Sequence, residues 1–111
     1  MKIGELARRS GLSVHTIRWY ERIGLMPRAG RDDGGQRDYD PAILAWVEFI
    51  GRLKTTGMPV REMVRYAELR AQGPQTGSER RALLEAHRAR VRAHAAEIAA
   101  GLAVLDAKIA G

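Results

Sequence analysis

The sequence has 111 residues, which is enough for one small domain with an added helix and too few for a separate ligand-binding domain of ordinary size. It contains no cysteine, which excludes disulfides, thiolate-bound zinc, iron–sulfur clusters and thiol redox sensing. The net charge of +6 favours nucleic acid as a partner, and seven basic against two acidic residues in positions 1–31 concentrate this charge near the N-terminus.

Residues 3–23 favour two short helices joined by a glycine turn. Leu6 follows Ile3 at helical spacing, and Gly11 is placed to stop this first helix after about two turns. Ser13 can then cap a second helix that runs to about residue 23. Two short helices joined in this way predict a helix-turn-helix.

The next segment is typical of a short β-hairpin. Gly24 ends the second helix, and the predicted strands are Leu25–Met26 and Gln36–Tyr39. Glycine and aspartate residues between positions 30 and 35 form the predicted tip. A hairpin that follows a helix-turn-helix predicts a wing.

Two further helices complete the predicted compact domain. Asp40 and Pro41 form a strong helix start, with aspartate as the cap and proline at the first helical position, and Gly57 ends this third helix. The fourth helix begins near Pro59 and ends before Gly73. Its predicted inward face consists of Val60, Met63, Val64 and Ala67.

The last segment predicts one long helix. Ser78 is its expected cap, and no proline follows, so that the helix approaches 30 residues and a length of about 45 Å. Apolar residues recur at heptad spacing, which favours a coiled-coil homodimer; the alternative is a helix folded back onto its own domain. The predicted dimer interface consists of Leu84, Val91, Ala95, Ile98, Leu102, Leu105 and Ile109.

These elements predict a mainly α fold: a winged helix-turn-helix domain with a small β-hairpin wing, followed by a long C-terminal coiled-coil dimerisation helix. We expect the domain over residues 1–72, a linker over 73–77 and the dimerisation helix over 78–111.

Residues 13–26, SVHTIRWYERIGLM, closely resemble the recognition-helix signature of the MerR family of bacterial regulators. Residues 37–39, 49–54 and 57–63 are similar to further family segments in order and spacing. The resemblance implies a homodimer with an antiparallel dimerisation helix, bound to a pseudo-palindrome in double-stranded promoter DNA. It also implies that the protein bends and untwists a promoter spacer, and so acts on RNA polymerase indirectly.

Several side chains are candidates for DNA contact. Arg18 can grip guanine or phosphate, and His15 lies where family members read base edges, although a solvated surface histidine is the alternative. Trp19 and Tyr20 either pack in the core or offer their polar atoms to phosphates. Helical spacing turns Tyr20 inward and puts Trp19 on or near an outer face. The resemblance favours phosphate contact for Tyr20, and a core position stays open as the alternative for Trp19. The complete predicted set is Ser13, His15, Thr16, Arg18, Trp19, Tyr20, Arg28, Arg37, Tyr39, Lys54 and the backbone near Met58.

The chain departs from the family where effectors bind. Metal-responsive members carry cysteines near the end of the dimerisation helix, and an electrophile-responsive branch carries one near the position of Gly51 or Arg52. Drug-binding members add a large domain, whereas this sequence ends soon after Ile109. We therefore expect a short form without an effector-binding domain and with no cofactor. A small-molecule effector stays possible, but the sequence does not identify one.

Other function classes fit less well. His87 and His94 lie too far apart to share one metal ion, so interface packing or exposure is favoured over a sensor. Without a catalytic constellation we expect no enzyme, and without a membrane span or signal peptide we expect a cytoplasmic protein. The alternative of another class is an interaction module whose long helix pairs with a different protein; the basic N-terminal segment and the four family segments count against it.

Overall fold

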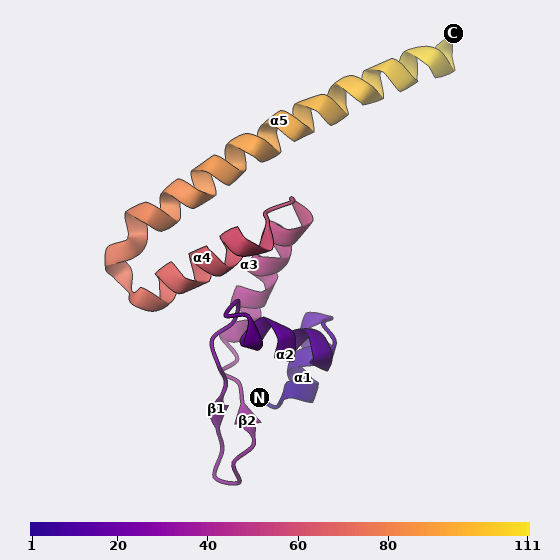
Figure 1. Cartoon of the computed structure of the whole chain (residues 1–111). Helices are drawn as coiled ribbons and strands as arrows, with labels where there is room; N and C mark the ends of the chain where they lie inside the picture. Colours follow the sequence, from indigo (N-terminus) through magenta and orange to yellow (C-terminus); the bar gives the residue numbers. More distant parts are fainter.

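The computed structural model describes all residues from 1 to 111, and it is mainly helical. One long helix extends away from a small domain that carries a two-stranded wing at its opposite end (Figure 1). The longest dimension of the molecule is 68 Å. None of the helices has both the length and the apolar content needed to cross a membrane.

Helices α1 (Ile3–Ser10) and α2 (Val14–Arg22) form the predicted helix-turn-helix. Gly11 ends α1 at φ +76°, a conformation that glycine adopts without strain, and its amide donates to the carbonyl of Ala7. The hydroxyl of Ser13 accepts the Thr16 amide, as expected for the cap of α2.

The wing differs from its prediction in one of its two strands. Strand β1 (Gly30–Arg31) pairs antiparallel with β2 (Arg37–Asp38), so the predicted first strand at Leu25–Met26 is wrong. Both of those side chains are buried in the core, and both amides donate to the carbonyl of Tyr20 at the end of α2. Two consecutive apolar residues after a helix have the same sequence pattern as a short buried strand. This similarity explains why a strand was predicted at Leu25–Met26.

Helix α3 (Ile43–Thr55) begins slightly later than expected. Asp40 does act as a cap, since its carboxylate accepts the Ala42 amide and its carbonyl accepts the Ile43 amide. These bonds form a turn over Asp40–Ala42, and regular α-helix starts only after it. Gly57, at φ +89°, follows the end of α3 as predicted.

Helix α4 (Val60–Gln72) packs against the core through Met63, Val64 and Ala67 of the predicted side, but not through Val60. Met63, Tyr66 and Leu69 are buried, whereas Val60 is 43% exposed, so its predicted inward position is wrong. The reason is aromatic: the ring of Tyr66 stacks on that of Trp46 in α3, with centroids 6.0 Å apart, and this contact sets the rotation of the helix.

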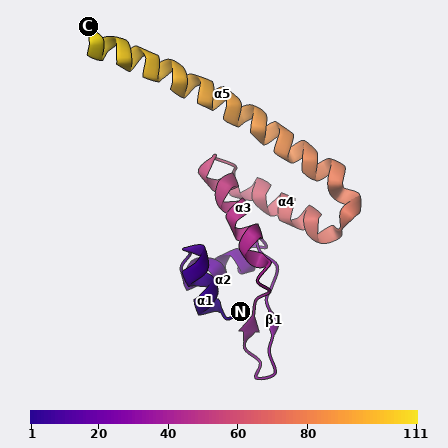
Figure 2. The ribbon, with the colours of Figure 1, turned by 180° about the vertical axis from the view of Figure 1, so that it is seen from behind.

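Helix α5 (Gly77–Ala110) follows a short 3-10 turn, η1 (Pro74–Thr76). Ser78 lies within the first turn of α5 rather than at its cap, because the 3-10 turn leads directly into the helix. The Thr76 hydroxyl donates to the Leu69 carbonyl and accepts Arg80 Nε, which ties this turn to α4. The first part of α5 packs along α4, and the rest projects beyond the domain in both views (Figures 1 and 2).

A single hydrophobic core joins α1, α2, α3, α4 and the base of the wing. Leu6 and Ile17 are fully buried where α1 crosses α2, and the Trp46 indole N–H donates to the Leu25 carbonyl at 2.9 Å. The core therefore fixes the position of the wing relative to α2.

Candidate nucleic-acid interface

A basic groove lies between α2 and the wing. It has a volume of about 420 Å³, and Glu21 is the single acidic residue in its lining. We call it the arginine groove. Its basic side chains are Arg18 and Arg22 from α2, Arg28 from the connecting segment, and Arg31 and Arg37 from the two strands.

Most of this positive charge is not neutralised within the protein. Arg18, Arg22 and Arg28 make no ion pair, and Arg31 donates only to the Gly35 carbonyl. Arg37 alone pairs with an acid, Glu21, at 3.6 Å between Nε and Oε2. Guanidinium groups crowded in this way attract phosphate groups, which they bind with two parallel hydrogen bonds.

A second, smaller groove adjoins the arginine groove. Arg18, Arg31 and Arg37 line both grooves, and Lys2 joins them in the second. The sequence-predicted residues Arg18, Arg28 and Arg37 are therefore brought together in one basic surface.

Predicted residues at the start of α2 lie on its outer side. His15 and Arg18 are exposed and Thr16 is half-buried. The Ser13 hydroxyl lies 2.9 Å from the Thr16 hydroxyl and accepts the Thr16 amide, so both hydroxyls are engaged within the protein. His15 and Arg18 are consequently the free polar side chains of this helix start.

The aromatic pair follows helical spacing. The Tyr20 ring is 4% exposed and belongs to the core, whereas Trp19 is 36% exposed, so a core position for Trp19 is wrong. The Tyr20 hydroxyl has no hydrogen-bond partner in the chain. It is not enclosed either, because the only enclosed polar side-chain atom without a partner is Nδ1 of His87. The Tyr20 hydroxyl therefore reaches the surface at the edge of a buried ring.

Tyr39 anchors the wing to α2. It is 3% exposed, and its hydroxyl donates to the carboxylate of Glu21. Burial, together with this hydrogen bond, raises the pKa of the Tyr39 hydroxyl well above its usual value. The resemblance implies that Tyr39 contacts the DNA backbone. In the structure, its hydroxyl instead makes a hydrogen bond within the protein.

The turn between α3 and α4 departs from the expected phosphate site. Lys54 is exposed, but the Met58 side chain is 4% exposed and its amide donates to the Leu53 carbonyl at 2.9 Å. The Met58 amide is therefore not available to a phosphate, because it closes the end of α3. A phosphate contact by the other amides at the start of α4 stays a prediction.

The predicted dimer residues divide into two groups along α5. Leu84 packs against the core of its own domain and Val91 is half-buried. The folded-back alternative thus describes the first turns of the helix. The other group projects beyond the domain, and Ala95 in it is exposed. Its large apolar side chains are 51–84% exposed, and they are Ile98, Leu102, Leu105 and Ile109.

His87 takes a role that sequence analysis did not give it. Its ring is 6% exposed, and Nε2 lies 2.7 Å from the hydroxyl of Thr56, which follows α3. Because that hydroxyl donates to the Arg52 carbonyl, Nε2–H must donate to it, and Nδ1 is left enclosed without a partner. His94, one heptad later, is exposed.

Arg22, Arg31 and Glu21 were missed as site residues. Arg22 lies four residues after Arg18, so the shared helix face was a usable signal. Arg31 could be predicted as a site residue only with the correct strand positions. The role of Glu21 could be predicted only from the wing folded against α2.

Models of known families match most of the chain. Residues 2–39 match a model described as MerR family regulatory protein, and residues 44–108 match one described as MerR, DNA binding.

The curated relatives are described as HTH-type transcriptional regulators. The chain is similar to the HTH-type transcriptional regulator AdhR of Bacillus subtilis, with 36% identity over 82% of this chain and 65% of AdhR, just under two thirds of that protein. It is also 36% identical to an HTH-type regulator of Haemophilus influenzae, over 94% of this chain and 77% of the relative.

Among solved structures, a MerR family transcriptional regulator from Listeria monocytogenes superposes with a TM-score of 0.92 at 32% identity, covering 98% of this chain and 83% of that one. HiNmlR, described as a MerR family regulator lacking the sensor domain, bound to promoter DNA, gives 0.88 at 34% identity, over 98% of this chain and 86% of that one.

Proposed function

We propose that this chain, which belongs to the MerR family of DNA-binding transcription regulators, acts as a homodimer that binds a pseudo-palindrome in promoter DNA. The relatives are named as transcription regulators, which agrees with the expectation that the protein is not an enzyme. The observation that carries the proposal is the arginine groove, in which α2 and the wing present five guanidinium groups, four of them without an acidic partner.

The proposal divides the DNA contacts between α2 and the wing. We assign base edges in the major groove to Arg18 in the arginine groove and to His15, which is exposed at the start of α2. We assign phosphates to Arg28, Arg31 and Arg37 on the wing side of the groove. The accessible hydroxyl of Tyr20 and the exposed Lys54 and Trp19 add candidate phosphate contacts. Ser13, Thr16 and Tyr39 shape the surface through their internal hydrogen bonds.

The exposed end of α5 supports a second copy as its partner. Four large apolar side chains at heptad spacing are unprotected in the isolated chain, which disfavours a monomer in water. An antiparallel pairing of two such helices covers both stripes at once, since a two-fold axis makes the interface self-complementary. The two arginine grooves are then related by the same axis, which matches a palindromic site.

Regulation follows from holding DNA in a strained shape. A rigid dimer whose grooves are set at a fixed separation bends or untwists the intervening duplex, so that the central base pairs matter through their deformability. Repression or activation then depends on which promoter shape RNA polymerase accepts. We place this activity in the cytoplasm, where a bacterial promoter is found.

The proposal is tested by selecting bound duplexes from a random-sequence library with the purified protein. We expect enrichment of sites with two inverted half-sites around a central spacer. Enrichment of a single, unsymmetrical half-site would contradict the homodimer, and no enrichment at all would contradict sequence-specific binding.

A further inference from the structure

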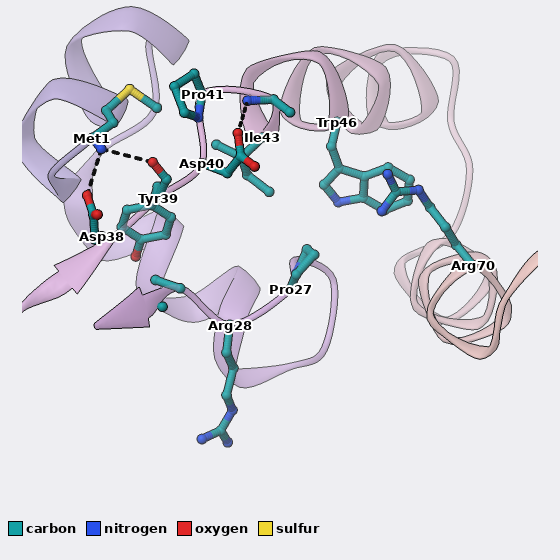
Figure 3. A pocket seen from close by; sticks show the side chains of 13 residues that line it. Met1, Pro27, Arg28, Asp38, Tyr39, Asp40, Pro41, Ile43, Trp46 and Arg70 are labelled. Carbon is teal, nitrogen blue, oxygen red and sulfur yellow. Dashed lines mark hydrogen bonds and ion pairs between the residues drawn. The ribbon is translucent and has the colours of Figure 1, made fainter. Parts of the chain in front are cut away.

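A cavity larger than the arginine groove adjoins it. It has a volume of about 580 Å³, within the range of small-molecule sites, and it lies between the segment that leads into the wing, the start of α3 and the end of α4. Figure 3 shows its labelled side chains arranged around an open centre. Its apolar walls are Met1, Pro27, Ala29, Pro41, Ile43 and Trp46.

The acidic groups of this cavity already have partners. The carboxylate of Asp38 accepts the N-terminal ammonium group of Met1 at 2.7 Å, and the carboxylate of Asp40 accepts the Ala42 amide at 2.9 Å (Figure 3). Neither acid pairs with an arginine.

Arg70 is an exposed cation that lines the cavity and makes no ion pair within the protein. Its guanidinium lies over the ring of Trp46, 4.6 Å from the ring centroid, and none of its N–H groups donates to a side chain or carbonyl of the protein. The stacking holds the planar group in one orientation, so its donors are preorganised for an acceptor with two oxygens. Arg28 also lines the cavity, but its side chain points away from the centre (Figure 3).

We propose that this cavity binds a small aromatic carboxylate, with its carboxylate on Arg70 and its ring between the apolar walls. A single carboxylate matches the guanidinium fork. A phosphate or other multiply charged anion is disfavoured, because Asp38 and Asp40 line the same cavity and half of the wall cannot solvate it. The rigid rings of Pro27, Pro41 and Trp46 suit a flat apolar body.

Binding at this site is coupled to the proposed function, and this step rests on that function. Arg28 and Ala29 line both the cavity and the arginine groove, so the segment that carries them is a common wall. An occupant of the cavity that shifts this wall also shifts Arg28. By linkage, a ligand that changes DNA affinity has its own affinity changed by DNA by the same factor.

The site is tested without DNA by calorimetric titration of the protein with 2-naphthoate and with its neutral analogue 2-naphthamide. We expect saturable binding of one naphthoate per chain with a Kd below about 1 mM, and binding of the amide at least about tenfold weaker. Absence of naphthoate binding up to that concentration, or equal binding of the amide, would overturn the proposal.

Two variants locate the site independently. Arg70→Gln removes the charge and Ala42→Phe fills the cavity from an exposed position, and each should weaken naphthoate binding at least about tenfold. Arg92→Gln, an exposed arginine of α5, is the matched control and should bind as the unchanged protein does. Unchanged binding by Ala42→Phe would overturn the site even if Arg70→Gln proved unfolded.

The coupling is tested by measuring DNA affinity with and without saturating naphthoate. We expect a change of threefold or more in the unchanged protein and none in Ala42→Phe. An identical DNA affinity would overturn the coupling. A protein that binds naphthoate but no DNA would instead contradict the proposed function, so the two failures are distinguishable.

Discussion

The hydroxyl of Tyr39, at the end of the wing, donates a hydrogen bond to the carboxylate of Glu21 in α2. The same carboxylate is 8% exposed and lies 3.6 Å from Arg37 Nε. One buried acid in α2 thus contacts both a tyrosine and an arginine of the wing.

Removing the tyrosine hydroxyl tests this anchor. Tyr39→Phe leaves a buried carboxylate without its donor, which should cost about 1–3 kcal/mol of unfolding free energy. We also expect DNA affinity to fall, because the wing loses its fixed position. Urea unfolding and a DNA titration measure the two effects. A variant as stable as the unchanged protein would mean that this hydrogen bond does not hold the wing.

Arg18 is the arginine that both grooves share on α2. Arg18→Ala should weaken binding to the cognate duplex at least about 30-fold, since each lost bidentate contact contributes about 1–3 kcal/mol and a dimer loses two. Arg92→Ala, on the exposed face of α5, controls for lost charge and should change affinity little. Fluorescence anisotropy compares them, and equal affinities for the two variants would remove Arg18 from the site.

The dimer interface is tested at its most exposed part. Ile98→Glu with Leu105→Glu places two charges in the apolar stripe, and we expect the protein to sediment as a monomer. Ala100→Glu with Ala107→Glu adds the same charge to the opposite face of α5, so this control should remain a dimer. If the first variant also remains a dimer, the interface lies elsewhere.

The contact between His87 and Thr56 joins the dimerisation helix to the end of α3. Thr56→Val should destabilise the protein by about 1–3 kcal/mol, because it leaves Nε2 enclosed without an acceptor. His87→Leu in the Thr56→Val background should recover part of this loss, since both polar groups are then absent. Thermal unfolding distinguishes the variants; a double variant less stable than the single one would contradict this account of the contact.

Acid should weaken the base of the wing. The N-terminal ammonium group lowers the pKa of Asp38 below 3.8, and Lys2 does the same for Asp32. A carboxyl whose pKa is depressed by folding adds stability above its unfolded pKa, and that stability is lost as pH falls through the folded pKa. As pH is lowered below about 4, the urea concentration at the unfolding midpoint should decrease in both proteins. The decrease should be smaller in Asp38→Asn than in the unchanged protein. Parallel curves would contradict a role for this pair.

Local chemistry was sufficient to predict much of the fold. Gly11, Gly24 and Gly57 adopt positive φ where helix ends were expected, and Ser13 caps α2 as its position indicated. These features depend on residues a few positions apart, which is why the sequence alone indicates them.

Predictions failed where a distant contact decides. Leu25 and Met26 have the pattern of a strand, but the core takes both of them. Val60 has the spacing of a core residue, yet stacking between Tyr66 and Trp46 turns it outward. For the site, Arg18 could be predicted from α2 alone, whereas the shared carboxylate of Glu21 appears only once the wing is folded.

The most direct test of the account is a titration of the purified protein at physiological salt against two duplexes. One carries the promoter region upstream of its own gene, and the other has the same composition in scrambled order. Specific recognition through the arginine groove predicts a preference of about 10³ or more for the native duplex. Equal binding to both, falling steeply as salt is raised, would mean that only charge is recognised, and it would contradict sequence-specific recognition of this promoter.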